Sequence, residues 1–465
     1  MKFFSPHEYQ HHALAWLIRR TIVEGQSGGA LFLDPGLGKT ATTLCWLRLL
    51  KSLGLSRKTL VVAPLRVVYS VWGQECKKWS QFAGMTCSIV HGSSTHRMKA
   101  LSVDADLYLI NPEGIPWLQT YYAKRPLPFG TLVVDESSKF KNWSALRTKA
   151  LRKMLGGFRY RLILTGTPSP NGIADLFSQV FILDQGEALG TGVTKFRNRY
   201  FYRGGFGGYK WILNEGSQKR IEQKIDHLCL RLSAEDHLDL PEMLINDVWI
   251  DLPTKALKEY RRLEREMFLE LDAGDDLVLS NAGAKYNACR QMAGGGIYDE
   301  DKKATPLHSA KMDAVVDLVD ELQGKPALVA YSYTHELERL RKVFPSCKAI
   351  YGATKGKEAD ALIEQWNKGE LHLLAVQPKS LSHGINMQAG PGRDIIWFGL
   401  TDNLEDYQQL NARIHRQGVD GNVRIHRILA RETIDEAIAE RIESKDQAQS
   451  ALLDALNKYR GRYGA

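Results

Sequence analysis

The feature that most constrains this chain is the segment Leu31–Thr40, L-F-L-D-P-G-L-G-K-T, which passes abruptly from apolar residues to glycine, lysine and threonine. The run A-L-F-L has the character of a buried parallel strand, and Leu44, Leu47 and Leu50 follow it at helical spacing. A glycine loop between a strand and a helix presents backbone N–H groups at the helix N-terminus, where the helix dipole also favours an anion. The segment therefore predicts a phosphate-binding loop.

Each residue of this loop has an expected role in binding a nucleoside triphosphate, which we take to be ATP. Gly36, Leu37 and Gly38 would supply the backbone, Lys39 a positive charge for the β- and γ-phosphates, and Thr40 a hydroxyl for Mg²⁺. The pattern G-x-x-x-x-G-K-[ST] begins with a glycine that is a leucine here. The alternative is a glycine-rich turn that happens to carry a lysine.

Length and composition restrict the class of protein. A chain of 465 residues with 44% hydrophobic and 25% charged residues suggests a globular protein of about two to four domains. A net charge of +9 favours an anionic partner such as nucleic acid. Six cysteines without a C-x-x-C pair predict neither a disulfide framework nor a structural zinc site. Since no signal peptide or long apolar run is visible, we expect a cytoplasmic protein that is neither secreted nor membrane-bound.

A helix is expected ahead of the phosphate loop, over residues 6–20, with Tyr9, Ala13 and Leu17 on one face. Gln10 in this helix can project toward a bound base, because an amide donates to N7 of adenine and accepts from its exocyclic amine at once. A solvated side chain is the simpler reading of a single glutamine. The nearby histidines lack further ligands at metal-binding spacing.

A second chemical signal is the segment T-L-V-V-D-E-S-S-K-F-K-N at residues 131–142. A buried strand would deliver Asp135 and Glu136 to the carboxyl edge of a parallel sheet, where ligands bind in open α/β folds. Adjacent carboxylates are costly there unless they meet a metal or a transferable proton. Asp135 would hold Mg²⁺, and Glu136 would orient and deprotonate the attacking water.

A third strand and turn, Y-R-L-I-L-T-G-T-P-S-P-N-G, covers residues 160–172. Thr165 and Thr167 lie where a hydrogen-bond relay can sense the state of the nucleotide. An ST-turn that caps the strand is the structural alternative. The repeated alternation of strand and helix predicts a parallel sheet with helices on both faces.

The order of these motifs resembles superfamily-two helicases, and within them the Swi/Snf-like DNA translocases. The resemblance rests on Y-Q, G-L-G-K-T, A-P-L-R-V-V-Y-S-V-W, V-V-D-E-S-S-K-F-K-N and L-T-G-T-P-S-P-N-G in that order. It implies that Arg66 of A-P-L-R, together with Thr165 and Thr167, belongs to the nucleic-acid contacts. The family's D-E-x-H has Ser138 in place of the histidine, a departure at the position that couples nucleotide to DNA in the family.

The middle of the chain holds a basic and aromatic segment, residues 195–211, with five basic residues, seven aromatics and no acid. Basic side chains neutralise phosphates and aromatics stack on bases, so Arg197, Arg199, Arg203 and Lys210 are candidate DNA contacts. A structural hairpin whose aromatics cover the first domain is the alternative. The charged residues that follow predict a helical insertion.

The second half repeats strand and helix without a second phosphate loop, which predicts another parallel α/β domain. A helix is expected over residues 407–418, with Gln409, Arg413 and Arg416 on one face. A surface salt-bridge network is the plain reading of such a face.

Two segments of the second half extend the family resemblance. Residues 407–418 resemble the family's Q-x-x-G-R-x-x-R, with Ala412 for glycine, which implies that Arg413 and Arg416 are arginine fingers and that Gln409 lies at the nucleotide. S-H-G-I-N-M-Q-A-G at 382–390 resembles G-x-N-x-x-A, which implies contacts of Gly384 with nucleotide and of Asn386 with DNA.

The sequence thus predicts two RecA-like P-loop domains of an α/β fold. We expect the first over residues 1–240, with the basic and aromatic insertion at about 195–235, and the second over 241–465, with the helical insertion at about 254–300. The resemblance implies a monomeric DNA-dependent ATPase, using ATP and Mg²⁺, that translocates on double-stranded DNA in a bacterial or virus-infected cell. A strand-separating DNA or RNA helicase and a nucleotide-switched DNA clamp are the alternatives.

Overall fold

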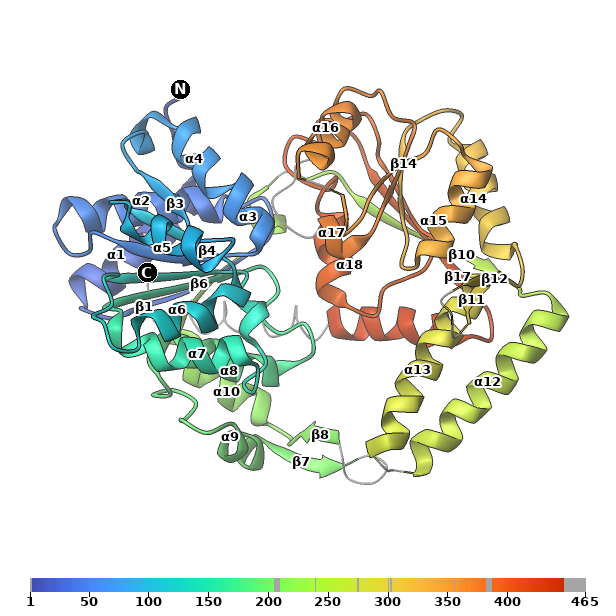
Figure 1. The fold of residues 1–465 in the computed structure, drawn as a ribbon, viewed down its shortest axis with the longest axis horizontal. Coiled ribbons are helices and arrows are strands. Elements are labelled where there is room, and N and C mark those ends of the chain that lie inside the picture. The colour runs from blue at the N-terminus through green and yellow to red at the C-terminus, as the bar shows by residue number, and fades with distance from the viewer. Residues whose placement is uncertain are drawn as a thin grey trace. The chain divides into compact units, whose positions relative to one another are not determined.

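The computed structural model describes residues 2–204, 210–238, 240–273, 276–299, 301, 303–354, 356–381 and 387–446. The chain forms two compact units: lobe 1 contains residues 2–204 and 210–238, and lobe 2 contains residues 240–445. Each lobe has its own parallel sheet, flanked by helices (Figure 1). The predicted fold class, two RecA-like α/β domains, is therefore confirmed.

Lobe 1 is built on a sheet of seven strands, all parallel to their neighbours. In spatial order they are β3 (Cys87–Ile89), β4 (Leu107–Ile110), β2 (Thr59–Val62), β5 (Thr131–Asp135), β6 (Tyr160–Thr165), β1 (Gly28–Leu33) and β9 (Cys229–Leu232). Most of these strands are completely buried, as the continuous apolar runs of the sequence require. Three of them, β5, β6 and β1, carry the candidate motifs and lie next to one another.

The helices of lobe 1 cover both faces of this sheet (Figure 1). They are α1 (Glu8–Ile18), α2 (Lys39–Ser52), α3 (Leu65–Ser70), α4 (Trp72–Lys78), α5 (Ser94–Ser102), α6 (Ile115–Tyr122), α7 (Leu146–Met154), α8 (Leu176–Asp184), α9 (Val193–Tyr200), α10 (Ser217–Ile225) and α11 (Ala234–His237). Leu44, Leu47 and Leu50 of α2 are buried, as their spacing predicts. An antiparallel hairpin, β7 (Phe201–Gly204) and β8 (Lys210–Leu213), follows α9.

Lobe 2 is built on a second parallel sheet, of six strands. In spatial order they are β10 (Met243–Ile250), β17 (Val423–Ala430), β16 (Asp394–Trp397), β13 (Ala327–Ala330), β15 (Leu373–Val376) and β14 (Lys348–Ile350). The apolar runs of the sequence predicted β13, β14, β15 and β16. Sequence reasoning missed β10 and β17, which pair along their whole length from Met243↔Val423 to Ile250↔Ala430.

The helices of lobe 2 include a long pair at the expected insertion. The elements are α12 (Thr254–Ala273), α13 (Asp276–Ala293), α14 (Ala310–Glu321), α15 (Thr334–Val343), α16 (Gly356–Asn367), α17 (Pro378–Leu381) and α18 (Leu404–Asn411), with a short hairpin of β11 (Gly296–Tyr298) and β12 (Ala304–Pro306). Helices α12 and α13 pack along each other. Within the described parts of the chain, no helix combines the length and the apolar character needed to cross a bilayer.

A buried ion pair joins α14 of lobe 2 to the residues that follow β17. Lys311 Nζ lies 2.5 Å from Asp435 Oδ2, and both side chains are at least 95% buried. Asp435 also accepts a hydrogen bond from the Ala430 amide, at 3.0 Å. Removing one partner of such a pair leaves an uncompensated charge in the interior.

We therefore predict that Lys311→Met destabilises lobe 2 by about 3–5 kcal/mol, because the Asp435 carboxylate stays buried without its cation. Thermal unfolding followed by circular dichroism measures the loss. Lys368→Met, which removes the exposed pair with Glu364, is the control and should leave the transition almost unmoved. Equal shifts in the two variants would contradict a stabilising role for the buried pair.

Candidate active site

The predicted phosphate loop lies between β1 and α2, and its backbone is shaped by two glycines. Gly36 and Gly38 have φ values of +97° and +71°, a region that L-residues avoid. A Cβ at Gly38 would lie only 2.2 Å from Gln10 Nε2, so the Gln10 side chain would have to move away from the loop. Helix α2 begins at Lys39, directly after Gly38. Lys39 Nζ donates to the carbonyl oxygens of Leu33 at 2.7 Å and Asp34 at 3.3 Å, which holds the ammonium against the loop.

Gln10 lies against this loop and is buried, with only 5% of its surface exposed, so the solvated reading of this residue was wrong. Its Nε2 donates to the Leu37 carbonyl at 3.3 Å, and its Oε1 accepts from the His7 amide at 2.9 Å. Contact of Gln10 with adenine stays a prediction, since at least one end of the amide would have to exchange its protein partner.

Asp34 fixes the first part of the loop, a role that sequence reasoning missed. Its amide donates to the Leu232 carbonyl at the end of β9, at 3.3 Å. Its Oδ2 accepts from the Ala234 amide at 3.0 Å and the Ser233 hydroxyl at 3.4 Å. These bonds attach the loop to the last strand of the lobe 1 sheet.

Asp135 ends β5 as an almost completely buried carboxylate. Its Oδ2 accepts a hydrogen bond from Trp72 Nε1 at 3.0 Å. Burial raises the pKa of Asp135, whereas the Lys39 ammonium, the Trp72 N–H and the Glu136 N–H act against that rise. Trp72 is fully buried and was not identified from the sequence as part of the site.

Glu136 follows in a left-handed backbone conformation, with φ +59° and ψ +63°. Thr165 Oγ1, at the end of β6, donates to Glu136 Oε2 at 3.4 Å and accepts from the Thr167 amide at 3.0 Å. The second bond is the ST-turn considered from the sequence, and the first links that turn to Glu136. Thr165 and Thr167 are both buried, so their assignment to direct DNA contact is corrected to a role inside lobe 1.

Gln179 of α8 joins two of the motif turns and was also missed. Its Oε1 accepts from the Ser137 hydroxyl at 2.6 Å, and its Nε2 donates to the Pro168 carbonyl at 2.6 Å and the Asp175 carbonyl at 3.0 Å. Its side chain is completely buried. The only signal in the sequence is an amide at a core position of the apolar helix L-F-S-Q-V-F-I-L.

The arrangement on lobe 1 fits a nucleoside triphosphate with a divalent cation. The loop, the Asp135–Glu136 turn and the Thr165 turn follow β1, β5 and β6, and parallel neighbours end at the same edge of a sheet. Strand register places Phe32 beside Thr165 and Leu164 beside Asp135. Hydroxyl and carboxylate oxygens are ligands that Mg²⁺ prefers, and the buried Asp135 carboxylate gains from a positive partner.

On lobe 2 the expected helix over residues 407–418 is wrong in extent, because α18 ends at Asn411. Hydrogen bonds to other parts of lobe 2 replace the helical ones after that residue. Asn411 Oδ1 accepts from Trp397 Nε1 at 3.1 Å, and the Arg413 carbonyl accepts from the Met387 amide at 3.2 Å. Gln409 lies in the helix, whereas Arg413 and Arg416 follow in turns, so the three do not form one helical stripe.

Burial separates these three candidates further. Gln409 and Arg413 are buried within lobe 2 and Arg416 is half-buried, which does not fit an exposed surface network. Gln409 Nε2 donates to Glu405 Oε1 at 3.3 Å. Gly384 and Asn386 lie outside the described residues.

The candidate DNA contacts occupy two regions of lobe 1. Arg66 lies in α3 and is half-buried. Arg197, Arg199 and Arg203 are exposed on α9 and β7, and the guanidinium groups of Arg197 and Arg203 lie 5.9 and 4.9 Å from the ring centre of Trp211. Lys210 begins β8.

The described aromatics of the same segment fit the alternative considered from the sequence, a hairpin whose aromatic side chains cover the first domain. Phe196, Tyr200 and Phe201 are buried in the lobe 1 core, and Trp211 packs against that core. The described aromatics of this segment therefore serve mainly as support, and the arginines around them face solvent.

A glycine loop with Lys39 and a strand that ends in Asp135 belong to the same parallel sheet, and a second parallel domain follows. Together they define a two-domain ATP-dependent enzyme of the helicase class. Residues 9–289 match the SNF2-related domain, and residues 310–418 match the helicase conserved C-terminal domain. The chain belongs to the SNF2-related family, whose members are DNA-dependent ATPases, and uses ATP.

Two relatives illustrate how similar this chain is to other proteins. Protein p41 of Acyrthosiphon pisum secondary endosymbiont phage 1 is 38% identical over 98% of this chain and 100% of its own length. YwqA of Bacillus subtilis (strain 168), named as an ATP-dependent helicase/translocase, is 24% identical over 97% of this chain and 49% of its own. The chain thus spans all of the phage protein but about half of the bacterial one.

The chain also matches a solved structure. It is the Sulfolobus solfataricus SWI2/SNF2 ATPase core in complex with dsDNA, at 19% identity and a TM-score of 0.44, covering 98% of this chain and 97% of that one.

The bonds of Gln179 generate a prediction about turnover. Gln179→Leu leaves the Ser137 hydroxyl and the Pro168 carbonyl without their buried partner, and should cost about 1–3 kcal/mol of stability. It should also lower the kcat of ATP hydrolysis far more than it raises the KM for ATP, because the Glu136 turn loses its support.

Ser178→Ala is the matched control for this variant. Ser178 is equally buried on α8 and donates to the Phe140 carbonyl at 2.6 Å, but it does not reach the Pro168 turn. Steady-state ATPase assays and thermal unfolding of both variants separate stability from turnover. If Ser178→Ala lowers kcat as much as Gln179→Leu at a similar melting temperature, the bridge between the two turns has no special role.

Proposed function

We propose that this chain is an ATP-driven translocase that acts on double-stranded DNA. The observation that carries the proposal is the presence of Lys39, Asp135 and Glu136 at the ends of nearby strands of lobe 1, in a chain of the SNF2-related family. The name of the B. subtilis relative, ATP-dependent helicase/translocase, supports a motor activity. A mouse relative, 23% identical over 96% of this chain and 50% of its own length, is named chromodomain-helicase-DNA-binding protein 1-like, which supports DNA as the partner.

In this proposal lobe 1 binds and activates the triphosphate. Lys39 and the backbone N–H groups of the loop would bind the β- and γ-phosphates, and Thr40 and Asp135 would hold Mg²⁺. The metal, when bound, supplies positive charge to the phosphate oxygens. Glu136 orients the attacking water and accepts its proton, and the Thr165 hydroxyl at 3.4 Å orients the Glu136 carboxylate.

The remaining candidates complete the nucleotide site. We assign Gln10 and Leu37 to the side of the loop that meets the base and Gln409 to the nucleotide from lobe 2. Arg413 and Arg416 are assigned to the γ-phosphate, where arginines stabilise the transferring group and contribute about 10³ to 10⁵ in rate.

In this proposal, motion along DNA follows from the loss of the γ-phosphate on hydrolysis. ATP favours the conformation in which the arginines and Lys39 share one γ-phosphate, and hydrolysis removes that shared ligand, so the populations shift in each cycle. The exposed Arg197, Arg199 and Arg203 would contact backbone phosphates, which carry no sequence information.

The decisive experiment compares stimulation of ATP hydrolysis by duplex and by single-stranded DNA. We predict stimulation by duplex, displacement of a third strand from a triplex, no unwinding of forks, and loss of DNA-dependent turnover in Lys39→Ala and Glu136→Gln. Fork unwinding would favour a strand-separating helicase, and DNA binding without stimulated turnover would favour a nucleotide-switched clamp. Near-normal turnover in either variant would overturn the site assignment.

Arg416→Ala tests the contribution of lobe 2. Since an arginine finger acts mainly on the transition state, hydrolysis should fall by about 10³ or more while ATP affinity stays within a few-fold. Single-turnover hydrolysis and equilibrium binding of a fluorescent ATP analogue measure the two effects. An equally large loss of affinity would assign Arg416 to ground-state binding instead.

A further inference from the structure

A second candidate ligand site lies on lobe 1, in a pocket between α7 and α8 that no motif of the chain covers. Its volume is about 390 Å³, at the lower end of the range of ligand pockets, about 300–1,000 Å³. Three cationic and two aromatic side chains line it with one threonine: Lys149, Arg152 and Lys153 of α7, Trp143, Phe181 of α8, and Thr191. Among the residues that the structure describes, no carboxylate lines this pocket.

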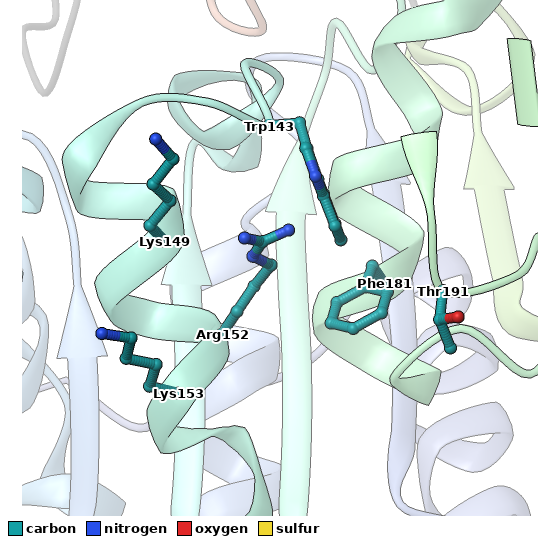
Figure 2. Close-up of a pocket in the computed structure, with 6 residues that line it drawn as sticks. All are labelled: Trp143, Lys149, Arg152, Lys153, Phe181 and Thr191. Atoms are coloured by element: carbon teal, nitrogen blue, oxygen red, sulfur yellow. The ribbon is translucent and has the colours of Figure 1, made fainter. Parts of the chain in front are cut away.

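The aromatic wall of the pocket packs against the lobe 1 core. Trp143 packs edge-on against Phe181 with ring centres 4.9 Å apart, and it contacts Phe177 at the same distance. Phe177 belongs to the lobe 1 core, so this wall is anchored to the sheet. Figure 2 shows Arg152 pointing from α7 toward Trp143, with Phe181 on the neighbouring helix.

Arg152 is held in a position that is costly without an anion. Its guanidinium lies 3.4 Å from the ring centre of Trp143, and within the described chain its buried Nε has no hydrogen-bond partner. Burial also lowers the pKa of Arg152, because a partly desolvated cation loses hydration. Stacking on the indole compensates only in part, since cation–π contacts contribute about 0.5–2 kcal/mol.

Lys149 adds charge that the fold of α7 does not require. Lys149 and Lys153 are one helical turn apart, about 6 Å along the axis, a spacing at which like charges weaken a helix. Both are exposed, and no ion pair to either is found within the described residues. The dipole favours Arg152 and Lys153 in the last turn of α7, but it explains neither Lys149 nor the aromatic wall.

We propose that this pocket binds a nucleotide unit of a nucleic-acid strand, with its phosphates on Lys149, Arg152 and Lys153 and its sugar or base against Trp143 and Phe181. Successive cations suit a ligand with successive negative charges, and aromatic rings beside them are typical of strand-binding surfaces. Thr191 lies two residues before α9, whose Arg197 and Arg199 are exposed, so further cations follow the pocket closely in the sequence. The inference rests on the proposed nucleic-acid substrate but not on ATP turnover.

The test measures the salt dependence of DNA binding by the full chain without ATP, using fluorescence anisotropy of labelled single strands and duplexes. The double variant Lys149→Gln with Lys153→Gln should reduce the slope of log K against log salt by about 1.4–1.8, the value for two phosphate contacts, and weaken binding about tenfold at low salt. Lys149→Arg with Lys153→Arg should restore both. Lys99→Gln with Lys124→Gln, two exposed lysines elsewhere on lobe 1, is the matched control and should change neither.

Photocrosslinking locates the contact independently of folding effects. A bromouracil-substituted strand should crosslink to the peptide that contains Trp143, and mass spectrometry identifies that peptide. An unchanged slope in the glutamine variant together with no crosslink in α7 or α8 would overturn the proposal. Binding of labelled polyglutamate to the same variants is measured in parallel. If the glutamine variant loses polyglutamate binding but keeps its DNA binding, the proposal is also overturned, because the pocket would then bind an acidic protein.

The two proposals fail in different ways. Turnover that duplex DNA does not stimulate, combined with a reduced salt slope in the glutamine variant, rejects the translocase and supports the pocket. Stimulated turnover with an unchanged slope and no crosslink rejects the pocket alone.

Discussion

The site on lobe 1 depends on the cost of burying the Asp135 carboxylate. A buried ion loses several kcal/mol of hydration, which must be offset by opposite charge and by hydrogen bonds. Here the offset comes from the Lys39 ammonium and the Trp72 indole, which belong to α2 and α4. The carboxylate is compensated only where both helices are docked on the sheet, so the packing of α2 and α4 and the assembly of the site depend on the same contacts.

The turn after Asp135 is held by bonds from outside it. Glu136 adopts a left-handed backbone that costs about 1–2 kcal/mol for an L-residue. Gln179 holds the next residue, Ser137, and the same amide holds Pro168, while Thr165 reaches the Glu136 carboxylate. A displacement of the Thr165–Pro168 turn would therefore shift Glu136, the proposed catalytic base. This coupling gives a physical basis for the relay expected from the threonines.

The parts of this protein that could be predicted from sequence are those set by local pattern. The phosphate loop, the Asp135–Glu136 turn and most inner strands follow from apolar runs that stop at glycine or polar residues, and parallel pairing then brings the motifs to one edge. The contacts that hold these motifs in place could not be predicted from local pattern. Trp72 and Asp34 lie in quoted motifs, but Trp72 meets a carboxylate 63 positions later and Asp34 meets an amide 200 positions later, so nothing local indicates either contact.

Two strands of lobe 2 were missed for a related reason. The segment V-R-I-H-R-I-L-A of β17 carries charges that suggest exposure, but Arg427 is buried because it pairs with Asp247 of β10 at 2.5 and 2.6 Å and with Glu443 at 2.8 Å. The Asp247 carboxylate of β10 and the Glu443 carboxylate together offset the cost of burying this charge. The early end of α18 has the same origin, since tertiary bonds at Asn411 and Arg413 replace the helical hydrogen bonds.

The early end of α18 matters for the role proposed for Arg413 and Arg416. Electrostatic stabilisation of a transition state is strongest when its donors are already in place. A turn fixed by packing within lobe 2 provides that preorganisation, whereas the frayed end of an exposed helix would have to be ordered in every cycle.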